Sequence, residues 1–273
     1  MAHLEYLLIV VFILLFVGIL AVTFVDGIVT HFIEPFYTAV THKPLYVHFY
    51  PRRKRLEFRQ ISILQRNAFY RRLSERQKLY FEHRVARFLE TYRFFGKDGL
   101  VVTEEMRITV ASVYVMLTFG MRHYLVDTFR DILLYPDVYR SRITDEFHKG
   151  EFNPKFKVVV FSWPHFLGGL ERDDNVNLGI HEFAHVLHFN SRKRRDNSAA
   201  NFAGRFDRLV IEVNHPPNRE RLMSSGYFRN YAYTNQHEFL AVVLEHFFET
   251  PSEFRRNFPE LYLHISRMIN LNH

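Results

Sequence analysis

The amino-terminal part of the chain is one continuous apolar run. Leu7 to Val25 comprises 19 residues without a charge, interrupted only by Gly18 and Thr23. As a helix this run is about 28 Å long, which matches the hydrocarbon core of a bilayer. The pattern predicts a single transmembrane helix, with residues 1–25 as a membrane anchor.

The flanking residues decide between an anchor and a secretory signal. The first six residues contain Glu5 and no Lys or Arg, and no A-x-A cleavage pattern follows. We therefore expect an uncleaved, single-pass anchor, with a cleaved signal as the alternative. The basic residues Lys43 and Arg52–Arg55 lie on the C-terminal side of the run, which predicts that the following domain is cytoplasmic.

Residues 26–56 are predicted to form a juxtamembrane connector, because Pro35, Pro44 and Pro51 interrupt regular structure. Within it, the basic run Arg52–Arg55 is placed to meet anionic lipid headgroups.

From residue 57 to residue 273 the pattern is that of one mostly helical domain. Residues 61–95 predict one or two amphipathic helices, and Thr103 is expected to cap a helix that reaches Gly120. Later helices are predicted at 178–189, 198–213, 236–249 and 260–269. Two short β-like runs, 132–135 and 156–163, predict a small sheet, so the expected fold class is α+β.

The helix predicted at 178–189 contains the motif His181-Glu182-Phe183-Ala184-His185. Residues four apart lie on one helix face, so both imidazoles can point at one ion. Glu182 can reach a water bound to that ion, which is the ligand pair and general base of a zinc hydrolase. The alternative is a pair of buried structural histidines, and the 16 His in the chain make a chance motif more frequent. We expect Asp173 or Asp174 to cap this helix.

Composition narrows the chemistry. The chain has no cysteine, which excludes thiolate zinc sites and leaves His and carboxylate as ligands. The net charge is +7, but no nucleic-acid-binding motif accompanies it, so we expect no nucleic-acid partner. The 29 Phe residues are interpreted as helix packing.

A catalytic zinc site takes three protein ligands and a water. Glu238 and Glu245 are seven residues apart on the helix predicted at 236–249, and they share its apolar face. A carboxylate on such a face is costly to bury unless it binds a partner. His188 is a further candidate, but a ligand from a separate helix closes the site with less strain, so Glu238 ranks above it.

Two more features bear on catalysis. Tyr231 and Tyr233 precede the helix at 236–249, and a tyrosine hydroxyl near the metal could donate to an oxyanion. The strand predicted at Phe156–Trp163 is a candidate for pairing with the substrate backbone, or else an ordinary core strand.

Together these residues resemble a known family over roughly residues 57–270. The chain is similar to Mlc titration factor A and its relatives, which are gluzincin-type zinc peptidases. The stretches that carry the resemblance are His181–Leu187, Tyr231–Val242 and Glu245–Phe248, with Asn67–Leu73 and Val101–Arg107 upstream.

The resemblance implies a zincin-like metallopeptidase domain with Zn2+ as cofactor and a peptide or protein as substrate. It implies His181, His185 and Glu238 as ligands, Glu182 as base and Tyr231 as the transition-state hydroxyl. Glu245 then becomes a carboxylate that orients a histidine ligand. The chain departs from the family at His188, where an acidic residue is usual, and in its leading apolar span.

The rival interpretation is a non-catalytic zinc protein that binds a regulatory protein partner such as a transcriptional regulator. Such a structural zinc is normally closed by four protein ligands, and His188 would be the fourth. An intramembrane protease is disfavoured, because Asp, Arg and Asn residues surround the motif.

Overall fold

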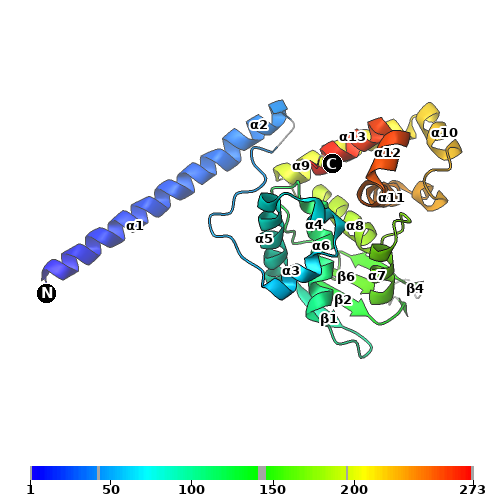
Figure 1. The fold of residues 1–273 in the computed structure, drawn as a ribbon. Coiled ribbons are helices and arrows are strands. Elements are labelled where there is room, and N and C mark those ends of the chain that lie inside the picture. The colour runs from blue at the N-terminus through cyan, green and yellow to red at the C-terminus, as the bar shows by residue number, and fades with distance from the viewer. Residues whose placement is uncertain (1, 42–43, 141–145, 195, 272–273) are drawn as a thin grey trace. The chain divides into compact units, whose positions relative to one another are not determined.

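A computed structural model describes residues 2–41, 44–140, 146–194 and 196–271 (Figure 1). The chain divides into two compact units, Met1–Tyr46 and Val47–His273. In the first unit, α1 (Ala2–Ile28) is followed by a π-helical turn, η1 (Val29–Ile33), and by α2 (Glu34–Thr41). Within α1, Leu4–Val25 is long and apolar enough to span a membrane.

The expectation that Pro35 interrupts regular structure was wrong. The chain remains helical through Pro35, which lies directly after the π-helical turn η1. Proline lacks the N–H of one helical hydrogen bond, and the π-helical turn before it accommodates that loss.

The second unit begins at Val47, ten residues before the domain boundary expected from the sequence. A buried arginine explains this. The Arg84 side chain donates to the Tyr50 hydroxyl at 2.6 Å, to the Val47 carbonyl at 3.2 Å and to the Met121 carbonyl at 2.7 Å. A fully buried guanidinium needs its donors satisfied, so residues 47–50 are held against the domain.

The amino-terminal half of this domain is helical. It contains α3 (Phe58–Leu64), α4 (Ala68–Arg72), α5 (Glu75–Thr91) and α6 (Glu104–Thr118). Thr103 caps α6 as predicted, since its side chain accepts from the Met106 amide. The region expected as one or two helices forms three, because Asn67 and Ser74 each accept from backbone amides and start new helices.

A small mixed sheet has the order β1–β2–β6–β5. Its strands are β1 (Arg93–Gly96), β2 (Asp131–Tyr135), β6 (Val158–Ser162) and β5 (Gly150–Asn153). β1, β2 and β6 are parallel, while β5 pairs antiparallel with β6. A separate pair joins β3 (Tyr139–Arg140) to β4 (Phe147–His148).

Of the two interpretations of the 156–163 run, the structure favours the core strand. The run contributes β6, which lies between β2 and β5, and the strands at the two ends of the sheet are β1 and β5. Three consecutive valines at 158–160 fit a strand that is covered on both faces, which favours the core alternative.

The C-terminal half carries the remaining helices. These are α7 (Trp163–Glu171), α8 (Leu178–Lys193), α9 (Asn197–Asn214), α10 (Pro216–Ser224), η2 (Asn230–Tyr233), α11 (Gln236–Glu249), α12 (Pro251–Asn257) and α13 (Pro259–Ile269). Helices α9 and α11 pack on α8 from the side opposite the sheet (Figure 1). The expected α+β fold, mostly helical with a small sheet, is confirmed.

Phenylalanine packs this core. Phe183, inside the motif, is fully buried, and its ring centroid lies 5.1 Å from that of Tyr114 on α6 and 5.4 Å from that of Phe161 on β6. Burial of such a side chain stabilises the fold by roughly 1.5–3 kcal/mol. One face of α8 is thereby fixed on the sheet and α6, which leaves the other face for the motif histidines.

Candidate metal centre

Helix α8 carries His181, Glu182 and His185. It begins after Asn177, whose side chain accepts a hydrogen bond from the Ile180 amide at 3.0 Å. The expected caps, Asp173 and Asp174, were wrong. Asp174 instead accepts from the Val176 amide, within the turn that precedes the helix. The three motif residues lie within the first two turns of α8, close to its capped and fixed end.

Helix α11 brings a carboxylate to the two histidines. Its cap, Asn235, accepts from the amides of His237 and Glu238, and Glu238 lies in the first turn. Glu238 Oε2 is 2.9 Å from His181 Nε2, and Glu238 Oε1 is 3.5 Å from His185 Nε2. The ligand atoms of His181, His185 and Glu238 all lie within 4.8 Å of one another.

This group fits a divalent metal ion. Ligand atoms of a tetrahedral zinc ion are about 3.3 Å apart, given bond lengths of about 2.0–2.1 Å. Glu238 Oε2 is buried and lies 2.9 Å from His181 Nε2, which is close to the separation of two ligand atoms on one ion. The three side chains retain 12–21% exposure, which leaves access for a solvent ligand.

Charge in the group also favours a cation. Burial alone would lower the pKa of His181, but the carboxylates of Glu238 and Glu245 outweigh it and raise this pKa to about 10. Burial, helped by the charge on His181, lowers the pKa of His185 to about 4. The carboxylates therefore hold a positive charge at the centre of the group, and a bound metal ion would replace that proton.

Glu182 lies on α8 beside the metal-binding group, and its side chain packs against β5. Its side chain is 7% exposed, and its carboxylate is hydrogen-bonded to the backbone of Phe152. Burial raises the pKa of Glu182 to about 7. The strand comes so close because residue 150 is glycine: a Cβ there would stand 3.0 Å from both Cγ and Oε1 of Glu182. A carboxylate with a pKa near neutrality can both accept and return a proton.

The second carboxylate of α11, Glu245, contacts His181 from behind. Glu245 is fully buried, and its Oε1 accepts from His181 Nδ1 at 2.8 Å. Arg229 donates to both oxygens of Glu245, at 2.5 and 2.9 Å. Arg229 could not be predicted from the sequence, because it lies in an irregular segment without a periodic pattern or motif.

The two tyrosines before α11 separate in the structure. The Tyr233 hydroxyl donates to the Leu222 carbonyl at 2.8 Å, which makes it a packing residue. The ring centroid of Tyr231 lies 5.9 Å from that of His181, and the side chain is 51% exposed. Burial and the charge of Glu238 raise the pKa of Tyr231 to about 12, so its hydroxyl stays protonated and able to donate.

His188 points to a different neighbour. Its ring centroid is 4.3 Å from that of His237 and 4.6 Å from that of Phe206. Among the residues that the structure describes, the only group of three or more potential ligands is His181, His185 and Glu238. A fourth protein ligand from His188 is therefore not part of the arrangement.

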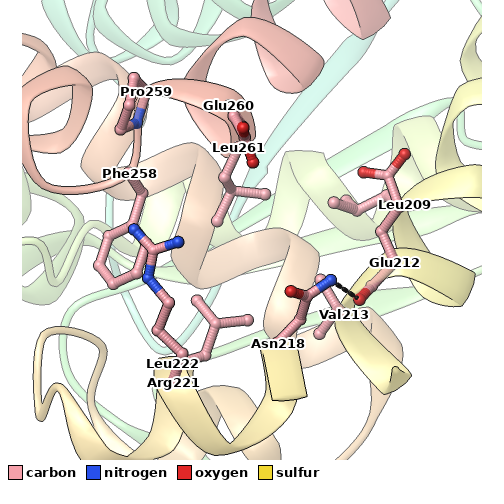
Figure 2. Close-up of a pocket in the computed structure, with 10 residues that line it drawn as sticks. All are labelled: Leu209, Glu212, Val213, Asn218, Arg221, Leu222, Phe258, Pro259, Glu260 and Leu261. Atoms are coloured by element: carbon pink, nitrogen blue, oxygen red, sulfur yellow. Dashed lines mark hydrogen bonds between the residues drawn. The ribbon is translucent and has the colours of Figure 1, made fainter. Parts of the chain in front are cut away.

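Two cavities lie on the helical side of the domain. One, of about 160 Å³ between α9, α10 and α13, is lined by the residues shown in Figure 2 and includes no member of the metal-binding group. The other, of about 180 Å³, is lined by Phe206, Asn235 and Phe239, among others. Asn235 and Phe239 flank Glu238 on α11, so the second cavity borders the turn that carries the carboxylate.

The group has the set of potential ligands found in metallopeptidases that use two histidines of one helix and a glutamate of another. Comparison with known proteins agrees. The chain belongs to the glucose-regulated metallo-peptidase family M90, whose model matches residues 51–269.

Its relatives include an uncharacterised protein of Synechocystis sp., 30% identical over 229 residues that cover 74% of this chain and 80% of the relative. The Mlc titration factor A of Serratia proteamaculans is 25% identical over 191 residues, 62% of this chain and 71% of that protein. That of Klebsiella pneumoniae is 24% identical over 198 residues, 65% and 73% of the two chains. The resemblance noted in the sequence is confirmed.

Proposed function

We propose that this protein is a zinc-dependent peptidase. The observation that carries the proposal is the convergence of His181, His185 and Glu238 on one point, with the Glu182 carboxylate buried beside them. The fit of the three ligand types to zinc and the metallo-peptidase family both support it.

His181, His185 and Glu238 would hold the zinc ion, which when bound would supply Lewis acidity and lower the pKa of a water towards neutrality. Glu182 accepts the proton of the attacking water and passes it to the leaving amine. The Tyr231 hydroxyl donates to the oxygen that gains charge on the carbonyl carbon. Strand β5, at the end of the sheet and beside Glu182, pairs with the extended substrate backbone.

Two matched variants test this mechanism. Purified full-length protein is assayed on short chromogenic peptides, with a chelator and with zinc added back. Glu182→Gln should keep one zinc and lose about 10²- to 10⁴-fold in turnover, since only the base is removed. Glu238→Ala should lose both zinc and turnover. Full turnover in Glu182→Gln would remove Glu182 from the mechanism, and unchanged zinc in Glu238→Ala would move the third ligand to another residue.

The second candidate function is a regulatory protein that binds a partner through a zinc-containing but non-catalytic domain. The names of two relatives favour it, because both are called titration factors for Mlc. A transcriptional regulator would then be the partner. In that case wild-type protein would hold zinc yet cleave no peptide, and Glu182→Gln would bind the partner as the wild type does.

The proposal also places the domain at a membrane. The apolar helix Leu4–Val25 would be an uncleaved anchor, and the basic run Arg52–Arg55 after it favours a cytoplasmic domain.

A further inference from the structure

Arg229 lies at the junction of three segments around the metal-binding group. It directly precedes η2, the short helix that carries Tyr231, and its side chain extends to α11 and to the turn before α8. We propose that Arg229 is a positioning residue: its guanidinium fixes the Glu245 carboxylate, which in turn fixes the orientation of the His181 ring. This inference rests on the proposed metal-dependent function.

The first step is the clamp on Glu245. Arg229 Nη1 donates to Oε2 at 2.5 Å and Arg229 Nη2 donates to Oε1 at 2.9 Å. Two parallel bonds from a planar guanidinium fix the plane of a carboxylate, which a single bond does not. Because Glu245 has no exposed surface, water cannot take over this role.

The second step is the contact between Glu245 and His181. Glu245 Oε1, one of the two clamped oxygens, lies 2.8 Å from His181 Nδ1. With Nδ1 held on Glu245, His181 Nε2 faces Glu238 at 2.9 Å, on the metal side of the ring. Partners on the far side of a ligating imidazole fix its rotation and raise metal affinity. Arg229 therefore influences the metal ion indirectly, through Glu245 and His181.

The third step is a hydrogen bond from Arg229 to the turn that precedes the motif helix α8. Arg229 Nη1 also donates to the Asn175 carbonyl, in the turn before α8. Asn175 has a left-handed backbone (φ 58°), and its side chain accepts from the Thr250 hydroxyl at the end of α11 at 2.8 Å. One guanidinium thus joins the two ligand-bearing helices. It also lies 5.9 Å from the centroid of the Tyr231 ring.

The test is a double-mutant cycle on zinc affinity, measured by chelator competition with the full-length protein in detergent. Arg229→Met and Glu245→Gln should each weaken zinc binding about 10- to 100-fold. The double variant should bind zinc no more weakly than Glu245→Gln alone, because Arg229 acts through Glu245. Zinc affinity within about twofold of wild type in Arg229→Met, or effects that multiply in the double variant, would overturn the inference.

The matched control is Arg192→Met. Arg192 also binds a carboxylate through both of its terminal nitrogens, that of Asp207, and it lies on α8 itself, but the pair is exposed. Its loss should leave zinc affinity unchanged. A drop equal to that of Arg229→Met would mean that any lost ion pair on α8 weakens the site, and would refute a specific role for Arg229.

Folding is separated from positioning by two further comparisons. Arg229→Met leaves the buried Glu245 without its counter-charge. The double variant removes both charges of the pair, and Arg229→Lys keeps both. If Arg229→Met does not fold, Arg229→Lys decides. Lysine keeps the positive charge but cannot form the two parallel hydrogen bonds of a guanidinium, so zinc affinity should fall about tenfold. Wild-type affinity in Arg229→Lys would overturn the inference.

The outcome is also separable from that of the proposed peptidase. A wild-type protein that binds zinc but cleaves no peptide would refute catalysis and leave the role of Arg229 intact. A wild-type protein that cleaves peptides, together with an Arg229→Met variant of unchanged zinc affinity, would support the peptidase and refute the role of Arg229.

Discussion

Gly150→Ala perturbs the base without touching a metal ligand. Gly150 lies on β5, and a Cβ added there would stand 3.0 Å from Cγ and Oε1 of Glu182 and 2.7 Å from Cδ1 of Leu178. Ordinary contacts begin at 3.4 Å. Glu182 must therefore retreat by at least the 0.4 Å between 3.0 and 3.4 Å, and Leu178 by the 0.7 Å between 2.7 and 3.4 Å.

This shift of Glu182 should lower peptide turnover without lowering zinc affinity. A misplacement of about 1 Å costs about 100-fold in rate, so a shift of roughly half that size should lower turnover about 10-fold, or about 1.4 kcal/mol. The atoms nearest the added Cβ belong to Leu178 and Glu182, and both motif histidines face Glu238, so zinc affinity should stay within about twofold of wild type.

The assay compares peptide turnover and zinc affinity in Gly150→Ala, the wild type and Gly204→Ala. Gly204 lies on α9 with nothing within 4 Å of an added Cβ. Gly204→Ala should therefore keep full turnover and gain about 1 kcal/mol in helix stability. Unchanged turnover in Gly150→Ala would contradict the position of Glu182 against β5. Loss of zinc in Gly150→Ala would show that α8 as a whole had moved, which also refutes the reasoning.

Two further predictions concern stability and location. Burial raises the pKa of Glu249 to about 8 in the folded protein. Between about pH 4.5 and 8 the unfolded chain has lost this proton and the folded protein keeps it, so wild-type stability falls as pH rises. Glu249→Gln should remove this loss. The free energy of unfolding of the variant, relative to that of the wild type, should be higher at pH 8 than at pH 5 by on the order of 1–3 kcal/mol, as measured by denaturant unfolding. An equal difference between variant and wild type at both pH values would contradict this prediction. The full chain should remain in the membrane fraction of a bacterial host after an alkaline carbonate wash. Soluble protein would refute an anchor, and a shortened chain would indicate a cleaved signal.

The sequence predicted the parts of the site that follow helical periodicity. His181 and His185 are four apart in an amphipathic pattern, and Glu238 lies on an apolar face that had to turn inward. Both patterns are local, so α8 and α11 could be read from single segments. The same pattern gave both Glu238 and Glu245, and the structure separates them: Glu238 faces both histidines, and Glu245 lies behind one of them.

The sequence could not reveal features that depend on contacts between distant segments. Strand β5 has the short and polar sequence Gly150–Asn153, which carries no strand pattern, and its pairing with β6 alone creates it. Arg84 reads as a surface charge on an amphipathic helix, although the structure buries it completely. Arg229 lies in the irregular segment before η2 and meets Glu245, 16 positions further on, in the middle of α11. Propensity and periodicity describe neighbours along the chain, and these three features depend on tertiary packing.

The proposed function depends on one metal ion and its ligands, and the position of that ion can be measured directly. A crystal structure of the zinc-loaded protein with anomalous diffraction recorded at the zinc edge locates every bound zinc. We expect one ion in contact with the imidazoles of His181 and His185 and the carboxylate of Glu238, with a further position open to solvent. An ion bound elsewhere, or one enclosed by four protein side chains including His188, would contradict it.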